Sequence, residues 1–244
     1  EMIHFSKYDC ERSIPNLVDG LKPSQRKILF AAFKRKLTRE VKVAQFSGYV
    51  SEHSCYHHGE TSLQKAIVGM AQDFVGSNNI NLLLPNGQFG TRMAGGKDSA
   101  SERYIYTQIN PLSKLLFPEA DLPVLNYLQD DGTSIEPEYY VPIIPLILAN
   151  GAKGIGTGFS TDILPHRPQD IVHYLKAKLR GKKTLPNIEP YFRGFKGTMQ
   201  KVSATKYLFK GLYKVLDGQR VHITELPVGC WTDDYKSYLD NLID

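Results

Sequence analysis

The sequence predicts an α+β fold in two units, and three observations support this prediction. The first half contains two stretches with the apolar spacing of amphipathic helices, at residues 24–36 and 61–76. The second half combines helical stretches with short segments typical of strands. A glycine-rich segment at residues 151–158 separates the two halves. Because 244 residues suffice for two buried cores, we expect domains at residues 1–148 and 149–244.

The first unit is predicted to contain a helix-turn-helix. Ser24 can cap a helix that runs to about Lys36, with apolar residues on one face and cations on the rest. Thr61 and Gln64 match a capping box for the second helix, and Gly76 suits its C-terminal cap. Two such helices joined by a short segment are typical of helix-turn-helix and winged-helix domains, whose second helix enters the major groove of DNA.

Loops and short regular segments follow. The glycine-rich stretch at residues 87–101 carries Arg92 and Lys97, a pattern that indicates a mobile loop near an anionic ligand. Residues 139–148 are apolar and β-branched. For the second unit we expect regular elements at the following positions: helices at residues 169–179 and 233–243, and strands at residues 194–202, 206–216 and 220–226.

Charge is distributed unevenly along the chain. Nine basic and only two acidic residues lie between Arg12 and Lys42, a local excess larger than the net charge of +5 for the whole chain. In contrast, residues 119–138 contain six carboxylates and no Lys or Arg. One face is therefore expected to attract polyanions and another to avoid them. The alternative is that both stretches are simply solvated surface.

Composition excludes several classes of protein. Hydrophobic residues make up 41% and charged residues 23%, as in ordinary globular proteins. The longest apolar run, residues 141–149, contains two prolines and is far shorter than the roughly 20 residues of a membrane-spanning helix. The three cysteines are widely spaced, which argues against a disulfide framework or zinc site and favours a reducing compartment. With no signal peptide at the start and a helical stretch at the end, we interpret the chain as a fragment.

The segment around Tyr104 is the most informative for chemistry. A tyrosine hydroxyl has a pKa near 10 and is a poor nucleophile unless positive charge favours the phenolate. Arg103 is adjacent, and its guanidinium can hold two phosphate oxygens and stabilise the charge of a five-coordinate phosphorus. Taken alone, the segment favours the alternative that Tyr104 and Tyr106 are ordinary aromatics that pack against a strand or turn.

Several long motifs occur in one order along the chain. They are ERSIPNLVDGLKPSQRKIL at residues 11–29, YHHGE at 56–60, FVGSNN at 74–79, QFGTR at 88–92, KDSASERYIYT at 97–107, GAKGIGTG at 151–158 and ITELP at 223–227, the last followed by Trp231. Together they cover nearly the full chain and resemble the breakage-and-reunion core of eukaryotic-type type IIA DNA topoisomerases. The resemblance implies a winged-helix domain followed by the incomplete start of a tower-like α+β domain.

The resemblance also implies roles for particular residues. Tyr104 would become linked to a DNA 5′ phosphate with help from Arg103, while Tyr106 would be structural. The freed 3′ hydroxyl could then reverse the step, so that breakage is temporary, unlike hydrolysis. The residues expected to contact DNA by this likeness, or by their place in the glycine-rich loop, are Arg12, Lys22, Arg26, Tyr56, His57, His58, Arg92 and Lys97.

Two further residues are implicated in DNA contact. Ile155 lies in a glycine-rich segment that lacks the GK[ST] ending of a phosphate-binding loop. In the similar family this isoleucine bends DNA, as an apolar wedge between base pairs can do. The alternative is that Ile155 packs into its own core. Trp231 is either a DNA-facing aromatic or a core anchor.

The rest of the enzyme is expected outside this segment. The chain lacks the Glu-Gly-Asp-Ser and Asp-x-Asp elements that bind metal in the family and lacks an ATPase module, so we expect no metal site here, with Mg²⁺ and ATP bound by other regions. The YHHG spelling favours the eukaryotic or eukaryotic-virus branch over gyrase. The resemblance implies a homodimer that acts on double-stranded DNA, located in the nucleus unless the source is viral. Two alternatives stay open: a noncatalytic helix-turn-helix DNA-binding module and a hydrolytic nuclease.

Overall fold

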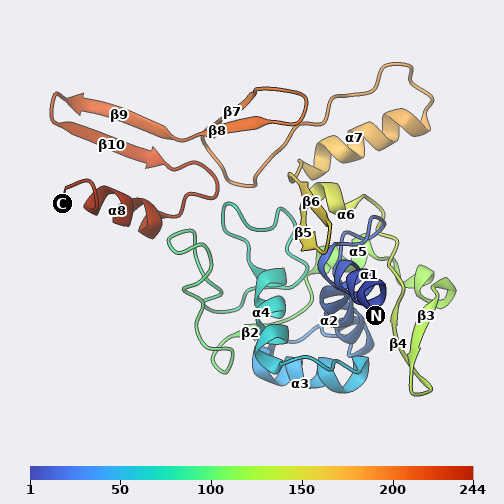
Figure 1. Ribbon diagram of the computed structural model, residues 1–244. Coiled ribbons are helices and arrows are strands. Elements are labelled where there is room, and N and C mark those ends of the chain that lie inside the picture. The colour runs from blue at the N-terminus through green and yellow to red at the C-terminus, as the bar shows by residue number, and fades with distance from the viewer. Residues whose placement is uncertain (244) are drawn as a thin grey trace.

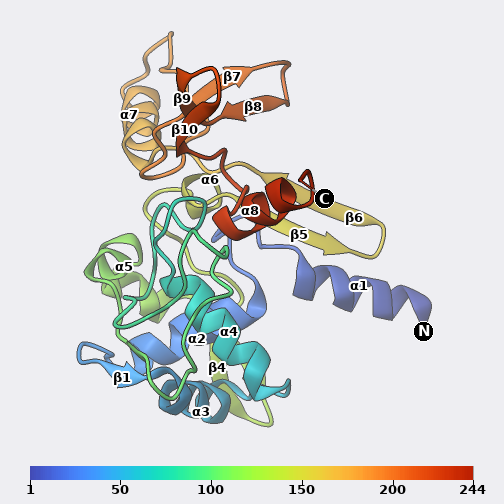
Figure 2. The same cartoon turned by 90° about the vertical axis from the view of Figure 1, so that its left-hand side faces the viewer.

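The computed structural model describes residues 1–243, which form two lobes joined by a connecting region, here called the waist (Figures 1 and 2). The elements in chain order are α1 (Met2–Ser13), α2 (Pro23–Lys34), β1 (Val41–Lys42), α3 (Val43–Ser54), α4 (Glu60–Ala71), β2 (Tyr106–Thr107), α5 (Pro111–Leu116), a 3-10 helix (Glu119–Val124), β3 (Tyr127–Asp130), β4 (Thr133–Pro137), α6 (Leu146–Ala149), β5 (Ala152–Gly156), β6 (Phe159–Ile163), α7 (Pro168–Leu179), β7 (Thr198–Lys201), β8 (Tyr207–Lys210), β9 (Leu212–Asp217), β10 (Arg220–Glu225) and α8 (Thr232–Asp240). The predicted α+β class is confirmed.

The core of the larger lobe is formed by α2, α3 and α4, which pack against one another. Each helix buries one apolar face, and in α3 this face is Val43, Phe46 and Val50. Only a short linking segment was expected where α3 lies, so that prediction was wrong. The spacing of the three buried residues was the available signal. Helix α1 was also missed, because it buries none of its residues and has no clear apolar stripe.

The predicted helix ends differ from the observed ones. Helix α2 begins at Pro23, so Lys22 is its N-cap rather than Ser24, and the Gln25 side chain accepts a hydrogen bond from the Lys22 amide at 2.9 Å. Proline favours the first helical position because its ring presets the backbone angle. Helix α4 begins at Glu60 and ends at Ala71, so the predicted caps at its two ends are not used.

All of the strands among residues 1–243 pair in two-stranded antiparallel sheets. The stretch predicted as one strand at residues 206–216 is divided by Gly211 into β8 and β9. Gly211 lies so close to β10 that an added Cβ would be 2.1 Å from the Glu225 carbonyl oxygen. The hairpin of β9 and β10 extends away from the core as an arm, with most of its side chains exposed (Figure 1).

The waist between the lobes contains α6 and the hairpin of β5 and β6 (Figure 2). The Asn79 side chain joins the two halves of the chain here, because its amide donates to the carbonyl oxygens of Ala149, His166 and Tyr191 at 2.9–3.2 Å. The domain division expected after residue 148 falls inside α6 and stays a prediction. Residues 139–148 form a mostly irregular segment that ends in α6.

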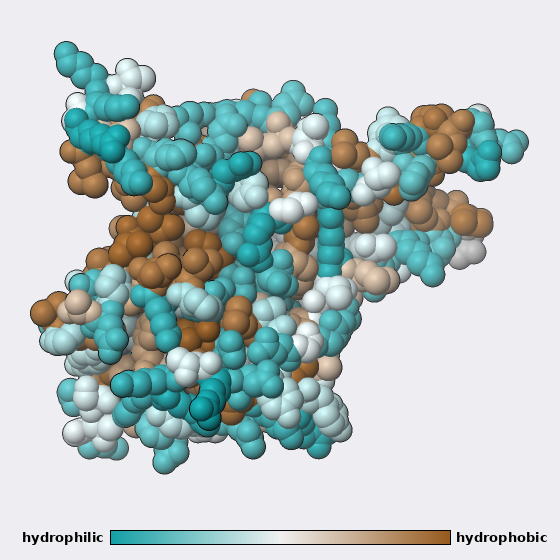
Figure 3. Space-filling view, turned by 180° about the vertical axis from the view of Figure 1, so that it is seen from behind, coloured by the Kyte–Doolittle hydropathy of each residue, from teal (hydrophilic) through white to brown (hydrophobic). Residues whose placement is uncertain are grey.

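Apolar side chains gather around α5 on the face seen from behind (Figure 3). Leu112 and Leu115 of α5 are exposed, as are Val141 and Ile143 of the irregular segment before α6. A backbone hydrogen bond of 2.9 Å from Ile143 to Leu116 joins that segment to the end of α5.

Candidate nucleic-acid interface and active site

A cleft of about 690 Å³ lies between α1, the start of α2, the link from α3 to α4, and the hairpin of β5 and β6. Its walls come from segments that are far apart in the sequence, which only the fold brings together. Six of the residues predicted to contact DNA line it: Arg12, Lys22, Tyr56, His57, His58 and Ile155. The cleft is therefore the place in the fold where most of the sequence-predicted site is assembled.

The cations of this cleft are not equivalent. Arg12 in the last turn of α1 is exposed, and Lys22 at the start of α2 is half-buried. Neither forms an ion pair with any of residues 1–243. Lys27, which was not among the predicted contacts, donates to the Ser54 carbonyl at 2.5 Å and to Glu136 at 2.9 Å. Arg12 and Lys22 are thus the cations available for an incoming phosphate, whereas Lys27 is held by protein groups.

The two adjacent histidines have different partners. The His57 ring lies 3.1 Å from the Asp130 carboxylate, and this hydrogen bond lowers the pKa of Asp130. The His58 ring packs edge-on against Tyr56 with centroids 5.3 Å apart and lies 3.4 Å from the Tyr8 hydroxyl. Burial lowers the pKa of His58, and the nearby positive charge of Arg12 lowers it further. His58 is therefore mostly neutral at pH 7.

Asp130 contradicts the expectation that the acidic stretch would stay apart from the basic one. It belongs to that stretch, yet β3 brings its carboxylate into the cleft beside His57. Glu136, from the same stretch, is buried and pairs with Lys27. Each of the two carboxylates is hydrogen-bonded to a basic side chain, and this pairing offsets the cost of removing a charged group from water.

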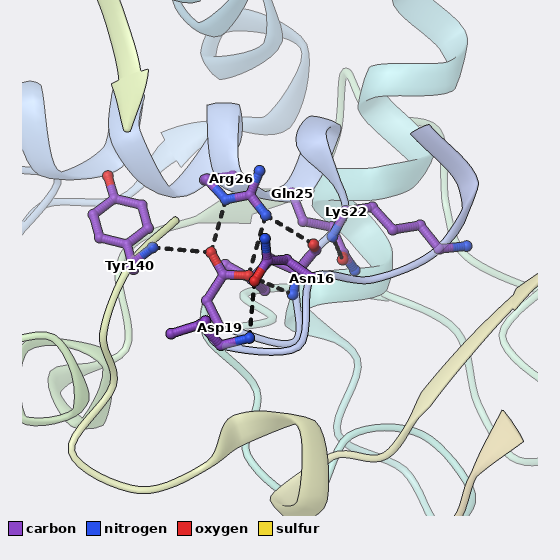
Figure 4. Close-up of polar contacts among 8 residues, drawn as sticks. Asn16, Asp19, Lys22, Gln25, Arg26 and Tyr140 are labelled. Carbon is purple, nitrogen blue, oxygen red and sulfur yellow. Dashed lines mark hydrogen bonds and ion pairs between the residues drawn. The ribbon is translucent and has the colours of Figure 1, made fainter. Parts of the chain in front are cut away.

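Arg26 corrects a second expectation. Its side chain is only 6% exposed, and its guanidinium donates to Asp19 through Nε at 2.7 Å and Nη2 at 3.1 Å (Figure 4). Nη2 also donates to the Leu21 carbonyl at 3.0 Å. Asp19 is fully buried and accepts additional hydrogen bonds from the amides of Leu21 and Tyr140. Arg26 is thus part of the internal polar network that holds the start of α2, and its guanidinium is engaged by protein groups.

Arg92 and Trp231 are also engaged within the protein. Arg92 donates to the Glu225 carboxylate at 2.7 Å and to the Leu226 carbonyl at 2.6 Å, which ties the glycine-rich loop to the end of β10. Trp231 packs edge-on against Phe74 with centroids 5.9 Å apart. Its indole also lies so close to Gly95 that an added Cβ would be 2.3 Å from Nε1. Trp231 thus anchors the glycine-rich loop within the protein, and because its side chain is only half-buried, a DNA contact stays a prediction.

Lys97, from the same loop, is exposed. Among residues 1–243, no ion pair or side-chain hydrogen bond involves it. The loop itself is held by Asp98, whose carboxylate accepts hydrogen bonds from the amide and hydroxyl of Thr91. Lys97 is thus free to contact an anion, in contrast to Arg92.

Tyr104 lies on a short loop whose backbone is fixed on both sides. Its amide donates to the Ser101 carbonyl, and the next residue, Ile105, is buried and accepts from the Val43 amide. The Tyr104 side chain, however, is 71% exposed, and the Arg103 guanidinium lies 5.8 Å from its ring centre. Tyr104 and Arg103 do not line the cleft. A tyrosine that packs into a core would be buried, so this geometry contradicts the packing alternative.

Ile155 lies in strand β5 near the end of a hairpin, not in a simple glycine-rich turn. Its side chain is 75% exposed, so it is not part of a core, and it lines the cleft. An exposed isoleucine at a hairpin end, beside two available cations, has the geometry of an apolar wedge.

The described residues do not suit a magnesium site. Within residues 1–243, no group of three or more His, Cys, Asp or Glu side chains could hold a metal ion. In the same range, no helix has the length and apolar character that a membrane crossing requires.

Comparison with known proteins gives consistent results. A family model that describes the A-subunit of DNA gyrase/topoisomerase IV matches residues 12–244. DNA topoisomerase 2 of Arabidopsis thaliana is 56% identical over 99% of this chain, which spans 17% of that protein. DNA topoisomerase 2-alpha of Mus musculus is 52% identical over 97% of this chain, which spans 15% of that protein.

A solved structure, the DNA-binding, cleavage and re-ligation domain of Plasmodium falciparum topoisomerase II, covers all of this chain with a TM-score of 0.97 and 49% identity. This chain covers 33% of the chain in that structure. The chain therefore belongs to the family of the DNA gyrase/topoisomerase IV A-subunit. Its resemblance to the eukaryotic type IIA DNA topoisomerases is confirmed by these relatives.

Proposed function

We propose that this chain forms the DNA-binding and strand-cleaving part of an ATP-dependent type IIA DNA topoisomerase, with Tyr104 as the nucleophile. The observation that carries this proposal is the exposed Tyr104 phenol on a fixed backbone beside Arg103. The relatives named above are DNA topoisomerases, and the chain spans less than a fifth of their length.

The proposed reaction exchanges one phosphate ester for another. The Tyr104 oxygen attacks a backbone phosphorus and its proton leaves to solvent or a base. The bond from phosphorus to the 3′ oxygen breaks, and that oxygen takes up a proton from solvent or an acid. The product is a 5′ phosphotyrosine ester and a free 3′ hydroxyl, and no water enters. The Arg103 guanidinium offsets the negative charge that builds on the phosphate oxygens. Because the ester bond is retained, the 3′ hydroxyl can attack it and restore the strand.

The cleft positions the duplex in this proposal. Arg12 and Lys22 contact backbone phosphates and His58 lies beside them, which gives affinity without reading the sequence. Tyr56 orients His58 through their edge-on contact, and His57 exchanges its Asp130 partner for DNA. Lys97 adds a phosphate contact from the glycine-rich loop.

Ile155 wedges between base pairs and bends the duplex in the same proposal. Its exposure at the end of the β5–β6 hairpin, within the walls of the cleft, supports this role. An apolar wedge and available cations on one surface are what bending a polyanion requires.

The whole protein supplies what these residues lack. We propose that Mg²⁺ and ATP are bound by regions outside this segment, and that two copies form a homodimer in which each protomer cuts one strand. A second duplex then crosses the opening. The proposed location is the nucleus; a relative from Dictyostelium discoideum, 55% identical, is named mitochondrial, so membership of the family does not by itself fix the compartment.

The test compares the full-length protein with two single variants, Tyr104→Phe and Tyr106→Phe. Each is incubated with supercoiled DNA and Mg²⁺, stopped with detergent and digested with protease. Tyr106 is the matched control because it lies two residues away and is only partly exposed. We expect linear DNA with a 5′-linked peptide from the wild type and Tyr106→Phe, and none from Tyr104→Phe, although all three bind DNA equally.

Two outcomes contradict the proposal. Linear DNA with ends free of protein would identify a hydrolytic nuclease. DNA binding without any adduct, even by the wild type, would favour a noncatalytic DNA-binding module.

A further inference from the structure

The hairpin of β5 and β6 has few contacts of its own, so something must fix the direction of Ile155. A two-stranded hairpin is marginally stable in isolation, and this one extends from the waist of the molecule (Figure 2). The element that packs along it is α1, at the N-terminal end of the chain, and the contacting residues Asp9 and Thr157 are 148 positions apart in the sequence. The contacts between α1 and this hairpin are concentrated next to Ile155.

The first contact is a pair of hydrogen bonds from Thr157 to Asp9. One carboxylate oxygen of Asp9, in α1, accepts from both the Thr157 amide and the Thr157 hydroxyl, each at 2.8 Å. These bonds lower the pKa of Asp9, so the carboxylate is charged at neutral pH. The Cys10 thiol is also 3.5 Å from the Thr157 carbonyl oxygen. Thr157 is two residues after Ile155 and lies in the turn of the hairpin.

The second contact is close backbone packing at two glycines. A Cβ added at Gly154 would lie 2.3 Å from the Ser13 carbonyl oxygen, which no real side chain tolerates. A Cβ added at Gly156 would lie 3.0 Å from the Cys10 sulfur and 3.1 Å from its Cα. The glycines on either side of Ile155 therefore let α1 approach the strand, while Ile155 itself points to the cleft and remains exposed.

We propose that Asp9 is a positioning residue for DNA bending: through Thr157 it locks the hairpin onto α1 and so holds Ile155 in the direction of insertion. This inference rests on the proposed wedge role of Ile155. It explains why the motif at residues 151–158 needs small residues and a threonine as well as an isoleucine. Insertion into stacked DNA requires a rigid wedge, because a hairpin that swings away avoids the cost of unstacking.

A purely electrostatic role for Asp9 predicts the opposite sign. The Asp9 carboxylate lines the cleft that Arg12 and Lys22 make attractive to phosphates, so its removal would strengthen DNA binding by charge alone. In the positioning role, its removal weakens bending whatever happens to affinity. The two roles are therefore separated by measuring affinity and bending on the same complex.

The experiment uses the full-length protein and a short duplex with a fluorophore at each end and 2-aminopurine at the central step. Energy transfer reports bending, 2-aminopurine fluorescence reports unstacking, and anisotropy reports affinity. The variants are Ile155→Ala, Asp9→Ala, Thr157→Val and Thr157→Ser. Glu1→Gln is the control. It removes a carboxylate at the N-cap of α1, and that carboxylate makes no capping hydrogen bond to the helix.

We expect Asp9→Ala and Thr157→Val to lower the ratio of bent to unbent complexes by roughly threefold to tenfold. This size is in line with the loss of charge-assisted hydrogen bonds. Thr157→Ser keeps the hydroxyl donor and should restore bending, and Glu1→Gln should match the wild type. Unstacking should fall in parallel with bending. Gly154→Ala, whose Cβ would lie 2.3 Å from the Ser13 carbonyl oxygen and so forces the hairpin off α1, should reproduce the Asp9→Ala result.

The outcomes separate this inference from the proposed function. If Ile155→Ala bends and unstacks DNA like the wild type, the wedge role is wrong. If Ile155→Ala fails to bend DNA while Asp9→Ala and Thr157→Val bend it normally, the wedge role stands and the positioning inference is overturned. Tighter binding by Asp9→Ala with unchanged bending would identify Asp9 as an electrostatic residue only.

Discussion

The buried network around Asp19 gives the sharpest test of which arginine serves the fold and which serves DNA. The change is Asp19→Ala in the full-length protein. Asp19 has no exposed surface and accepts four hydrogen bonds: two from Arg26, and one each from the Leu21 and Tyr140 amides. Its removal leaves the Arg26 guanidinium buried without a counter-charge (Figure 4).

The expected cost follows from this geometry. Removing one partner of a buried ion pair destabilises by about 3–5 kcal/mol, because the remaining charge is uncompensated. The Leu21 and Tyr140 amides lose their acceptor as well, and each unsatisfied buried donor costs about 1–3 kcal/mol, although these terms do not simply add. Since whole domains are stable by only about 5–15 kcal/mol, a loss of about 3 kcal/mol is a large share of the stability, and we expect α2 to open roughly a hundredfold more often.

Hydrogen exchange measures this effect within the full-length protein. We expect amide protection in α2 to fall by about 3 kcal/mol or more in Asp19→Ala, and the double variant Asp19→Ala/Arg26→Met to recover part of it. Arg12→Ala is the control, because Arg12 is exposed and its loss should leave protection within about 0.5 kcal/mol. Full protection of α2 in Asp19→Ala, or an Arg26→Met protein that keeps its stability but loses a phosphate contact, would refute the reasoning.

Three further predictions concern the cleft and the glycine-rich loop. Arg12→Gln and Lys22→Gln should each reduce the slope of log affinity against log salt by about 0.9, measured by anisotropy, and an unchanged slope in both would remove them from the interface. The pKa of His58 is lowered by burial and by Arg12, whereas a nearby phosphate favours its protonated form, so DNA affinity should rise as pH falls from 7.5 towards 6; if His58→Gln shows the same rise, another group is responsible. Gly95→Ala should cost about 1–3 kcal/mol of loop protection in hydrogen exchange, because its Cβ would meet Trp231 at a φ of +63°; normal protection would show that the loop is not docked on Trp231.

Local sequence signals predicted some elements well and missed others for identifiable reasons. Helix α7 and strand β10 lie where the spacing of apolar residues placed them, since both periods are clear in the sequence. Helix α1 could not be predicted in this way, because it has no buried face and is recognisable only by its contact with the hairpin of β5 and β6.

The candidate site was predictable as a set of residues but not as an arrangement. The motifs selected Arg12, Lys22 and Arg26 together, and nothing in their types separates an exposed arginine from a buried one. The position of Asp19 seven residues before Arg26 was a usable signal for an ion pair. For Arg92 no local signal existed, because its partner Glu225 is 133 residues away.

Lys22 and Arg26, at the start of α2, explain how one basic stretch can serve both binding and stability. From Lys22 onward the chain enters α2, and the first turn of a helix presents backbone amides and a partial positive charge. Pro23 and Ser24 of this turn line the cleft, so the helix end and the Lys22 ammonium face the same space. Arg26, one turn further on, points inward to Asp19 and fixes the angle at which the helix begins. In the proposed function, the buried arginine acts on phosphate recognition only through the direction of the helix, so its loss should destabilise the start of α2, whereas the loss of Arg12 should only weaken binding.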